Sequence, residues 1–189
     1  MKSKPAFTTK KIVLVALLAA LTAVSSTLRI KVPAGIAGTS AFHLGNIFCA
    51  LSGILLGPWL GGLAAGLGSA MHDIVFDPTY IAECWLTFLM KGAYGLMAGL
   101  VAHCGKKEWN YLKTVLASAA GAGTYAVLYL TKSYFKAIIV QGIAASGAWI
   151  AVVDKLPATI FNALVAILFA PILATAIRTS LKKNHLSLD

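Results

Sequence analysis

The sequence predicts an all-α membrane protein, a bundle of six transmembrane helices formed by one domain that covers residues 1–189. Apolar residues make up 59% of the chain and charged residues only 12%, and apolar runs of about the length that crosses a bilayer recur along it. The formal charge of +10 at pH 7 can indicate a nucleic-acid binder. In so apolar a chain it is more typical of cytoplasmic loops beside anionic headgroups. We therefore expect membrane lipid as a partner and no nucleic acid.

The apolar runs and the turn signals between them define the expected helices. A basic segment precedes the first run, as in a secretory signal peptide, but more membrane-type segments follow, so we expect a retained helix. The uncharged turn Gly57-Pro58 joins the second and third helices into a hairpin, and Asp77-Pro78 precedes the fourth. A polar loop over 103–111 precedes the fifth. The expected helices are 12–28, 41–56, 60–76, 80–102, 112–131 and 157–177, with a turn-rich stretch over 34–40.

Residues 137–153 are apolar but short for a span, and they contain Gln141 and two glycines. We expect a lateral or re-entrant segment here. The last helix is expected to begin near Pro157, because proline is favourable in the first turn of a helix.

The distribution of Lys and Arg predicts the orientation. With six spans, ten of these residues fall on the side of the two termini and five on the other. By the positive-inside rule both termini face the cytoplasm. We expect a multi-pass protein of the bacterial plasma membrane.

The first helix carries small residues four positions apart, Ala16 with Ala20 and Ala19 with Ala23. Such spacing makes a flat strip that another helix can approach closely, because helix association in lipid depends on packing. The strip is compatible with internal packing and with docking of a second protein.

Polar residues gather at the expected outward ends of the second, third and fourth helices. Polar groups at this depth are costly and need partners or water. The candidate ligand-binding residues are His43, Asn46, Asp73, Glu83, Thr87 and Lys91.

Lys91 is the most informative of these residues. An ammonium near the bilayer centre costs at least about 2.5 kcal/mol unless it faces an anion or a wet cavity. One interpretation is a buried ion pair with Asp73 or Glu83 that only fixes the bundle. The other is a cavity-lining lysine that contacts a polar ligand.

The motifs of several function classes are missing from the sequence. The fragment Gly99 to Lys107 has one residue too many between its glycines for a phosphate-binding loop, and no HExxH or GxSxG is present. The three cysteines show no metal-site spacing. We expect no enzyme, no catalytic residue, no metal and no cofactor in this chain.

Several stretches together resemble a known family. They are His43-Leu-Gly-Asn46, Leu51-Ser-Gly-Ile-Leu-Leu-Gly57-Pro58, the glycine-rich run from Gly61 to Asp73, and Thr87-Phe-Leu-Met-Lys91-Gly92. With the alanine strip and the six expected helices, they resemble the substrate-binding S components of energy-coupling factor (ECF) vitamin transporters, in the riboflavin-type and hydroxymethylpyrimidine-type branch.

The resemblance implies capture of a vitamin at the outward end and docking on a transmembrane coupling (T) subunit through the strip, with Ala16 and Ala20 as docking positions. Two partner ATPase subunits would use the ATP. The lateral segment and the loop after Arg29 would close over the site.

The expected pocket chemistry suits a small neutral or zwitterionic heteroaromatic molecule better than a polyanion. We expect hydroxymethylpyrimidine or a pyridoxine-type vitamin, with pantothenate and then riboflavin as alternatives. Two other classes stay open. An ion or proton channel would use Asp73, Glu83, Lys91 and His72 as a relay, and a structural membrane protein would bind no small molecule.

Overall fold

The computed structural model describes residues 9–33, 35, 38–105 and 110–184. Six α-helices, a two-stranded antiparallel sheet and a short 3-10 helix form this part of the chain. In order they are α1 (Thr9–Thr27), β1 (Arg29–Pro33), β2 (Thr39–His43), α2 (Gly45–Leu56), α3 (Pro58–Val75), η2 (Pro78–Glu83), α4 (Cys84–His103), α5 (Tyr111–Ile139) and α6 (Ala145–Lys183).

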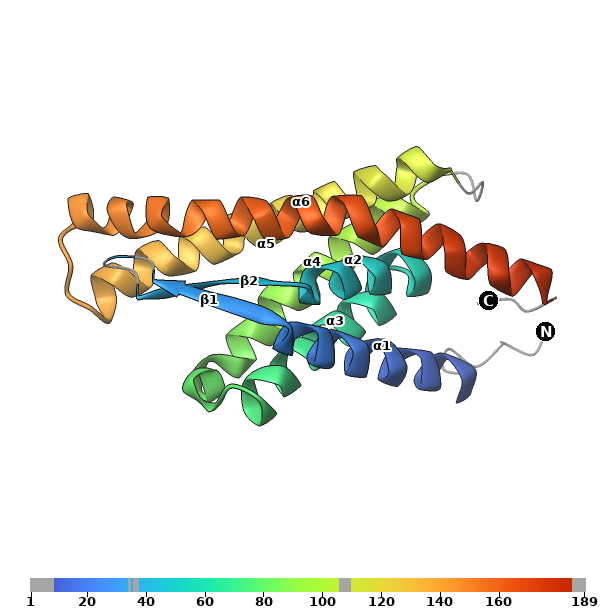
Figure 1. The fold of residues 1–189 in the computed structure, drawn as a ribbon, viewed down its shortest axis with the longest axis horizontal. Helices are drawn as coiled ribbons and strands as arrows, with labels where there is room; N and C mark the ends of the chain where they lie inside the picture. The colour runs from blue at the N-terminus through green and yellow to red at the C-terminus, as the bar shows by residue number, and fades with distance from the viewer. Residues whose placement is uncertain (1–8, 34, 36–37, 106–109, 185–189) are drawn as a thin grey trace.

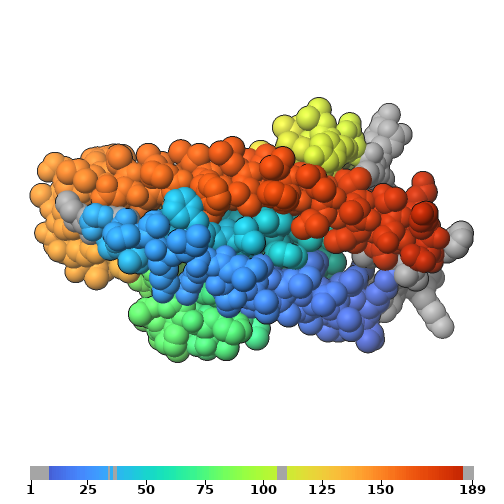
Figure 2. Space-filling view, viewed as in Figure 1, coloured from blue at the N-terminus to red at the C-terminus, as the bar shows by residue number. Residues whose placement is uncertain are grey.

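The helices form an elongated bundle with two different ends (Figure 1). The beginning of α1 and the end of α6 lie at one end. At the other end, α5 and α6 run on together as a long antiparallel pair, and the β1–β2 hairpin lies along this pair. Figure 2 shows the hairpin at the surface between α6 and the green region that contains the end of α3 and η2.

Glycines allow the backbones of α2, α3 and α4 to touch. A Cβ atom built on Gly61 would overlap the backbone of Ser52 and Gly53 in α2, and one on Gly53 would overlap the Gly95 carbonyl oxygen of α4. Small residues permit this approach, which takes the place of hydrophobic association inside a bilayer. The three helices therefore form a narrow, tightly packed block beneath the hairpin.

Four segments of the described chain are long and apolar enough to cross a membrane, and α2 is a shorter apolar helix. The long ones are Thr9–Thr27, Pro78–His103, Tyr111–Ile139 and Ala145–Lys183. Large apolar side chains such as Trp59, Trp85 and Ile139 are exposed on the surface, as lipid-facing side chains are. The chain is a helical, multi-pass membrane protein. Six crossings and cytoplasmic placement of both termini stay predictions.

The expected helix over 41–56 begins too early. Residues 39–43 form β2, which pairs with β1 from Arg29 opposite His43 to Pro33 opposite Thr39. Residues 29–33, for which no element was expected, form β1, and the end of the turn-rich stretch over 34–40 belongs to β2. Ala34, Ile36 and Ala37 lie outside the described residues. Pairing satisfies the backbone donors and acceptors of both segments without a helix. Helix α2 starts at Gly45.

The expected lateral segment over 137–153 is wrong. Helix α5 continues to Ile139, the chain turns near Gly142, which has a positive φ of 66°, and α6 begins at Ala145. Pro157 therefore lies inside α6 rather than in its first turn. Membrane helices tolerate an internal proline when neighbouring groups satisfy the backbone. The result is a longer α5–α6 pair that forms one wall of the site.

Candidate ligand-binding pocket

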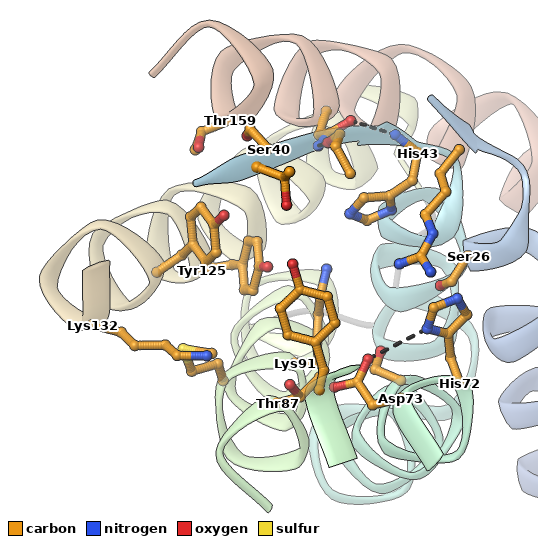
Figure 3. Close-up of a pocket in the computed structure, with 18 of the residues that line it drawn as sticks. Ser26, Ser40, His43, His72, Asp73, Thr87, Lys91, Tyr125, Lys132 and Thr159 are labelled. Atoms are coloured by element: carbon orange, nitrogen blue, oxygen red, sulfur yellow. Dashed lines mark hydrogen bonds and ion pairs between the residues drawn. The ribbon is translucent and has the colours of Figure 1, made fainter. Parts of the chain in front are cut away.

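A pocket lies where the β hairpin meets the helices. Its lining comes from the end of α1, both strands, the last turns of α3, η2, and the facing sides of α4, α5 and α6. Figure 3 shows the labelled side chains arranged around a shared hollow. The cavity has a volume of about 140 Å³, roughly ten times the volume that one water needs by the same kind of measure. It has room for a small organic molecule.

Four of the six predicted ligand-binding residues line this pocket: His43, Asp73, Thr87 and Lys91. Asn46 is buried behind Lys91, and its Oδ1 accepts a hydrogen bond from Lys91 Nζ. Glu83 lies apart from the lining and pairs with Lys132 and Lys136 of α5, at 2.5 Å in each case. The predicted residues therefore divide into four that line the pocket, one that supports Lys91 from behind, and one that forms ion pairs beside the pocket.

Lys91 is only 5% exposed, yet it lines the pocket. Its ammonium donates to Asn46 and lies 3.8 Å from the centre of the Tyr125 ring, a cation–π contact. Within the described part of the chain, no carboxylate oxygen lies within 4.0 Å of Lys91 Nζ. The ion pair with Asp73 or Glu83 that we considered is not formed.

Two histidines present unused ring nitrogens. His72 Nδ1 lies 3.3 Å from Asp73 Oδ1, whereas His72 Nε2 and His43 Nδ1 are buried and have no hydrogen-bond partner among the described residues. Burial, and then the nearby charge of Lys91, lower the pKa of His43 well below its ordinary value. A buried polar atom without a partner costs about 1–3 kcal/mol. Both histidines line the pocket.

The α5 wall is aromatic. Tyr125 and Tyr129 stand one helical turn apart, with ring centroids 5.6 Å apart and planes inclined by 18°, and both line the pocket. Sequence analysis missed Tyr125. Its signal is the spacing of Tyr125, Tyr129 and Lys132 on one helical face, which interfacial tyrosines also show.

Asn162 of α6 forms two hydrogen bonds with the hairpin. Asn162 accepts a hydrogen bond from the backbone N–H of His43 at 2.9 Å and donates to the Ala41 carbonyl at 2.8 Å. Both bonds satisfy backbone groups of β2. Asn162, which sequence analysis also missed, thereby positions His43 over the pocket.

Charged residues surround the rim. Asp77 binds Arg29 Nη2 at 2.5 Å and Lys31 Nζ at 3.1 Å, and this ties β1 to the turn after α3. Burial acts to raise the pKa of Asp77, but hydrogen bonds from Thr79, Lys31 and Arg29 outweigh this effect and hold the pKa at about 2. The carboxylate is thus charged at every physiological pH.

The alanine strip of α1 divides between two faces. Ala19 and Ala23 are buried, and a Cβ atom on Gly68 of α3 would overlap the Ala19 carbonyl oxygen. Ala16 and Ala20 are exposed. Internal packing therefore accounts for one pair, and only Ala16 and Ala20 lie on a surface that a partner could reach.

Similarity to known proteins indicates the family of this chain. The sequence over residues 6–179 matches the family described as "ECF-type riboflavin transporter, S component", which is a family of transporter components and not of enzymes. A curated protein of Pyrococcus woesei, described as "Uncharacterized protein in gap 3'region", is 29% identical over 115 residues, which cover 61% of this chain and 72% of the relative. Because the family match spans nearly the whole chain, this protein belongs to the ECF-type riboflavin transporter S component family.

Proposed function

We propose that this chain captures a vitamin or vitamin precursor in the pocket between the hairpin and α3–α6, as the substrate-binding subunit of an ECF-type importer. The observation that carries the proposal is the composition of the pocket. Lys91, His43, His72 and Asp73 line one small cavity of a membrane protein in this family, and one ring nitrogen of each histidine has no partner among the described residues. Such groups are costly without a ligand.

The pocket favours a small heteroaromatic substrate, with hydroxymethylpyrimidine or a pyridoxine-type vitamin as first candidates. The Tyr125–Tyr129 wall offers an aromatic surface for a ring, and His43, His72 and Asp73 offer hydrogen-bonding groups for ring nitrogens and hydroxyls. Pantothenate and riboflavin are the alternatives, and riboflavin is supported by the family description.

Transport itself requires partners under this proposal. The exposed residues Ala16 and Ala20 dock on a T subunit, and two ATPase subunits use the ATP, while this chain holds no cofactor. The pocket faces outward and both termini face the cytoplasm of a bacterial cell. In support, the beginning of α1 and the end of α6 lie at one end of the molecule, and the hairpin that covers the pocket extends toward the other (Figure 1).

The test is to purify the protein, denature it, and identify any released small molecule by mass spectrometry. The same molecule is then titrated against stripped protein and against a Lys91→Ala variant, for which we expect at least about tenfold weaker binding, or about 1.4 kcal/mol. Lys182→Ala, at the exposed end of α6, is the matched control and should bind as the wild type does. Protein that retains no ligand and gains no thermal stability from any of the four candidate vitamins would refute the proposal, and proton flux from the isolated chain in liposomes would favour a channel.

A further inference from the structure

Among the described cations that line the pocket, Lys91 is the one with no carboxylate oxygen within 4.0 Å. From this we infer that the bound substrate carries an acidic group, a carboxylate in the simplest case, which lies against Lys91. The inference rests on the proposed function and narrows its substrate class. It follows from a comparison of every charged side chain at the pocket with its partner.

The rim cations all have acidic partners. Asp77 binds both Arg29 and Lys31, and Glu83 binds Lys132 at 2.5 Å together with Lys136. These carboxylates each bridge two cations. They neutralise much of the positive charge that Arg29, Lys31 and Lys132 bring to the pocket lining.

The one acid that lines the cavity beside Lys91 is already engaged. Asp73 lies 3.3 Å from His72 Nδ1 and makes no ion pair with Lys91 within 4.0 Å. The partners that Lys91 does have, the Asn46 amide oxygen and the face of Tyr125, are neutral. A lysine ammonium has three donors, and Asn46 accepts one of them.

The lack of a carboxylate beside Lys91 matters because this lysine is buried. Lys91 is 5% exposed, so water does not screen its charge as it would at the surface. The lysine nevertheless lines the cavity, where a ligand atom can approach it. A carboxylate at this point would supply the missing counter-charge and a charge-assisted hydrogen bond, which is stronger than a neutral one.

The aromatic wall sets where the remainder of the molecule lies. Tyr125 contacts the ammonium and stacks with Tyr129. A planar ring placed along this wall would bring an acidic substituent on its edge toward Lys91, because Lys91 Nζ lies 3.8 Å from the centre of the Tyr125 ring. Among the candidates, pantothenate and acidic pyridoxine-type compounds then rank ahead of neutral pyridoxine, hydroxymethylpyrimidine and riboflavin.

The experiment compares matched pairs that differ in one charge: pantothenate with pantothenol, 4-pyridoxate with pyridoxine, and nicotinate with nicotinamide. Binding to stripped wild-type protein is measured by calorimetry and by thermal shift. In the pair whose scaffold fits, we expect the acid to bind at least about tenfold more tightly than its neutral partner. Equal or tighter binding of the neutral member overturns the inference.

Two variants separate charge from shape. In Lys91→Met we expect the preference for the acid to disappear, whereas Lys91→Arg keeps the charge and should keep the preference. If a folded Lys91→Met variant still prefers the acid, the inference is overturned. If Lys91→Met does not fold, loss of the preference in Lys91→Arg overturns the inference.

The molecule that copurifies decides the case in which no pair binds. An acidic molecule supports the inference. A neutral or cationic molecule overturns it and leaves the proposed function intact. If no molecule is retained and none of the compounds binds, both fail.

Discussion

The substitution Asn46→Asp tests the electrostatic logic of the pocket directly. The two side chains are nearly isosteric, and Asn46 Oδ1 already accepts a hydrogen bond from Lys91 Nζ, so the change places a carboxylate on the ammonium without rebuilding the site. The new carboxylate supplies the counter-charge that a ligand would otherwise provide. A hydrogen bond to a charged group contributes about 1.5–3 kcal/mol, and losing one from the ligand corresponds to a Kd about ten- to a hundredfold weaker. We expect this loss of affinity together with a higher melting temperature of the ligand-free protein.

The assay is calorimetric titration of stripped protein with its copurified ligand, alongside thermal unfolding in the same detergent. Asn46→Leu is the control, because it removes the amide oxygen and adds no charge. We expect Asn46→Leu to destabilise the ligand-free protein, since Lys91 then loses its hydrogen-bond acceptor, while the preference for an acidic ligand persists. Wild-type affinity in Asn46→Asp, or equal losses of affinity in both variants, would refute the reasoning.

Three further predictions concern docking, packing and the rim. Ala16→Trp or Ala20→Trp should abolish uptake by cells that carry the whole transporter and leave ligand affinity of the purified chain unchanged; loss of affinity would refute the separation of strip and pocket. Gly61→Ala should lower the free energy of unfolding by about 1–3 kcal/mol, because its Cβ meets the α2 backbone, whereas Gly123→Ala faces open space and should be neutral or slightly stabilising in thermal unfolding. Asp77→Asn should lower the free energy of unfolding by about 1.5–3 kcal/mol at pH 7. Because the folded pKa of about 2 lies below the unfolded value of about 3.9, the difference between wild type and variant should be constant from pH 5 to 8 and shrink as the pH falls toward 2. A difference that changes with a midpoint near pH 6 in unfolding measurements would contradict this prediction.

Sequence patterns predicted that α2, α3 and α4 are helices, because apolar runs and closely spaced glycines are typical of membrane helices. They failed where length and composition were ambiguous. Residues 137–153 are apolar but short for a separate span and contain Gln141 and two glycines. In the structure they are divided between the end of α5, a turn and the beginning of α6. The hairpin was missed because the pairing of β1 with β2 depends on a contact between segments, and neither strand alternates strongly enough to be recognised alone.

The residues of the pocket were also predicted only in part. His43, Asp73, Thr87 and Lys91 were predicted because polar residues stand out in apolar surroundings, and the structure places all four on one cavity. Tyr125 was overlooked because a tyrosine in a membrane helix is unremarkable until its neighbour is known. The orientation prediction counted residues such as Lys106 and Lys107, which lie outside the described residues, and it stays a prediction.

The positive charge of this chain has two roles that only the fold can separate. Most cations at the hairpin end join elements of the structure: Asp77 holds β1 against the turn after α3, and Glu83 holds the end of η2, just before α4, against α5. Each of these carboxylates touches two cations, so removing either one should weaken the fold at the pocket rim and leave the pocket interior intact. Lys91 differs because its described partners are neutral and its burial is almost complete. The rim charges therefore bear on the stability of the pocket, and the inner charge bears on what the pocket selects.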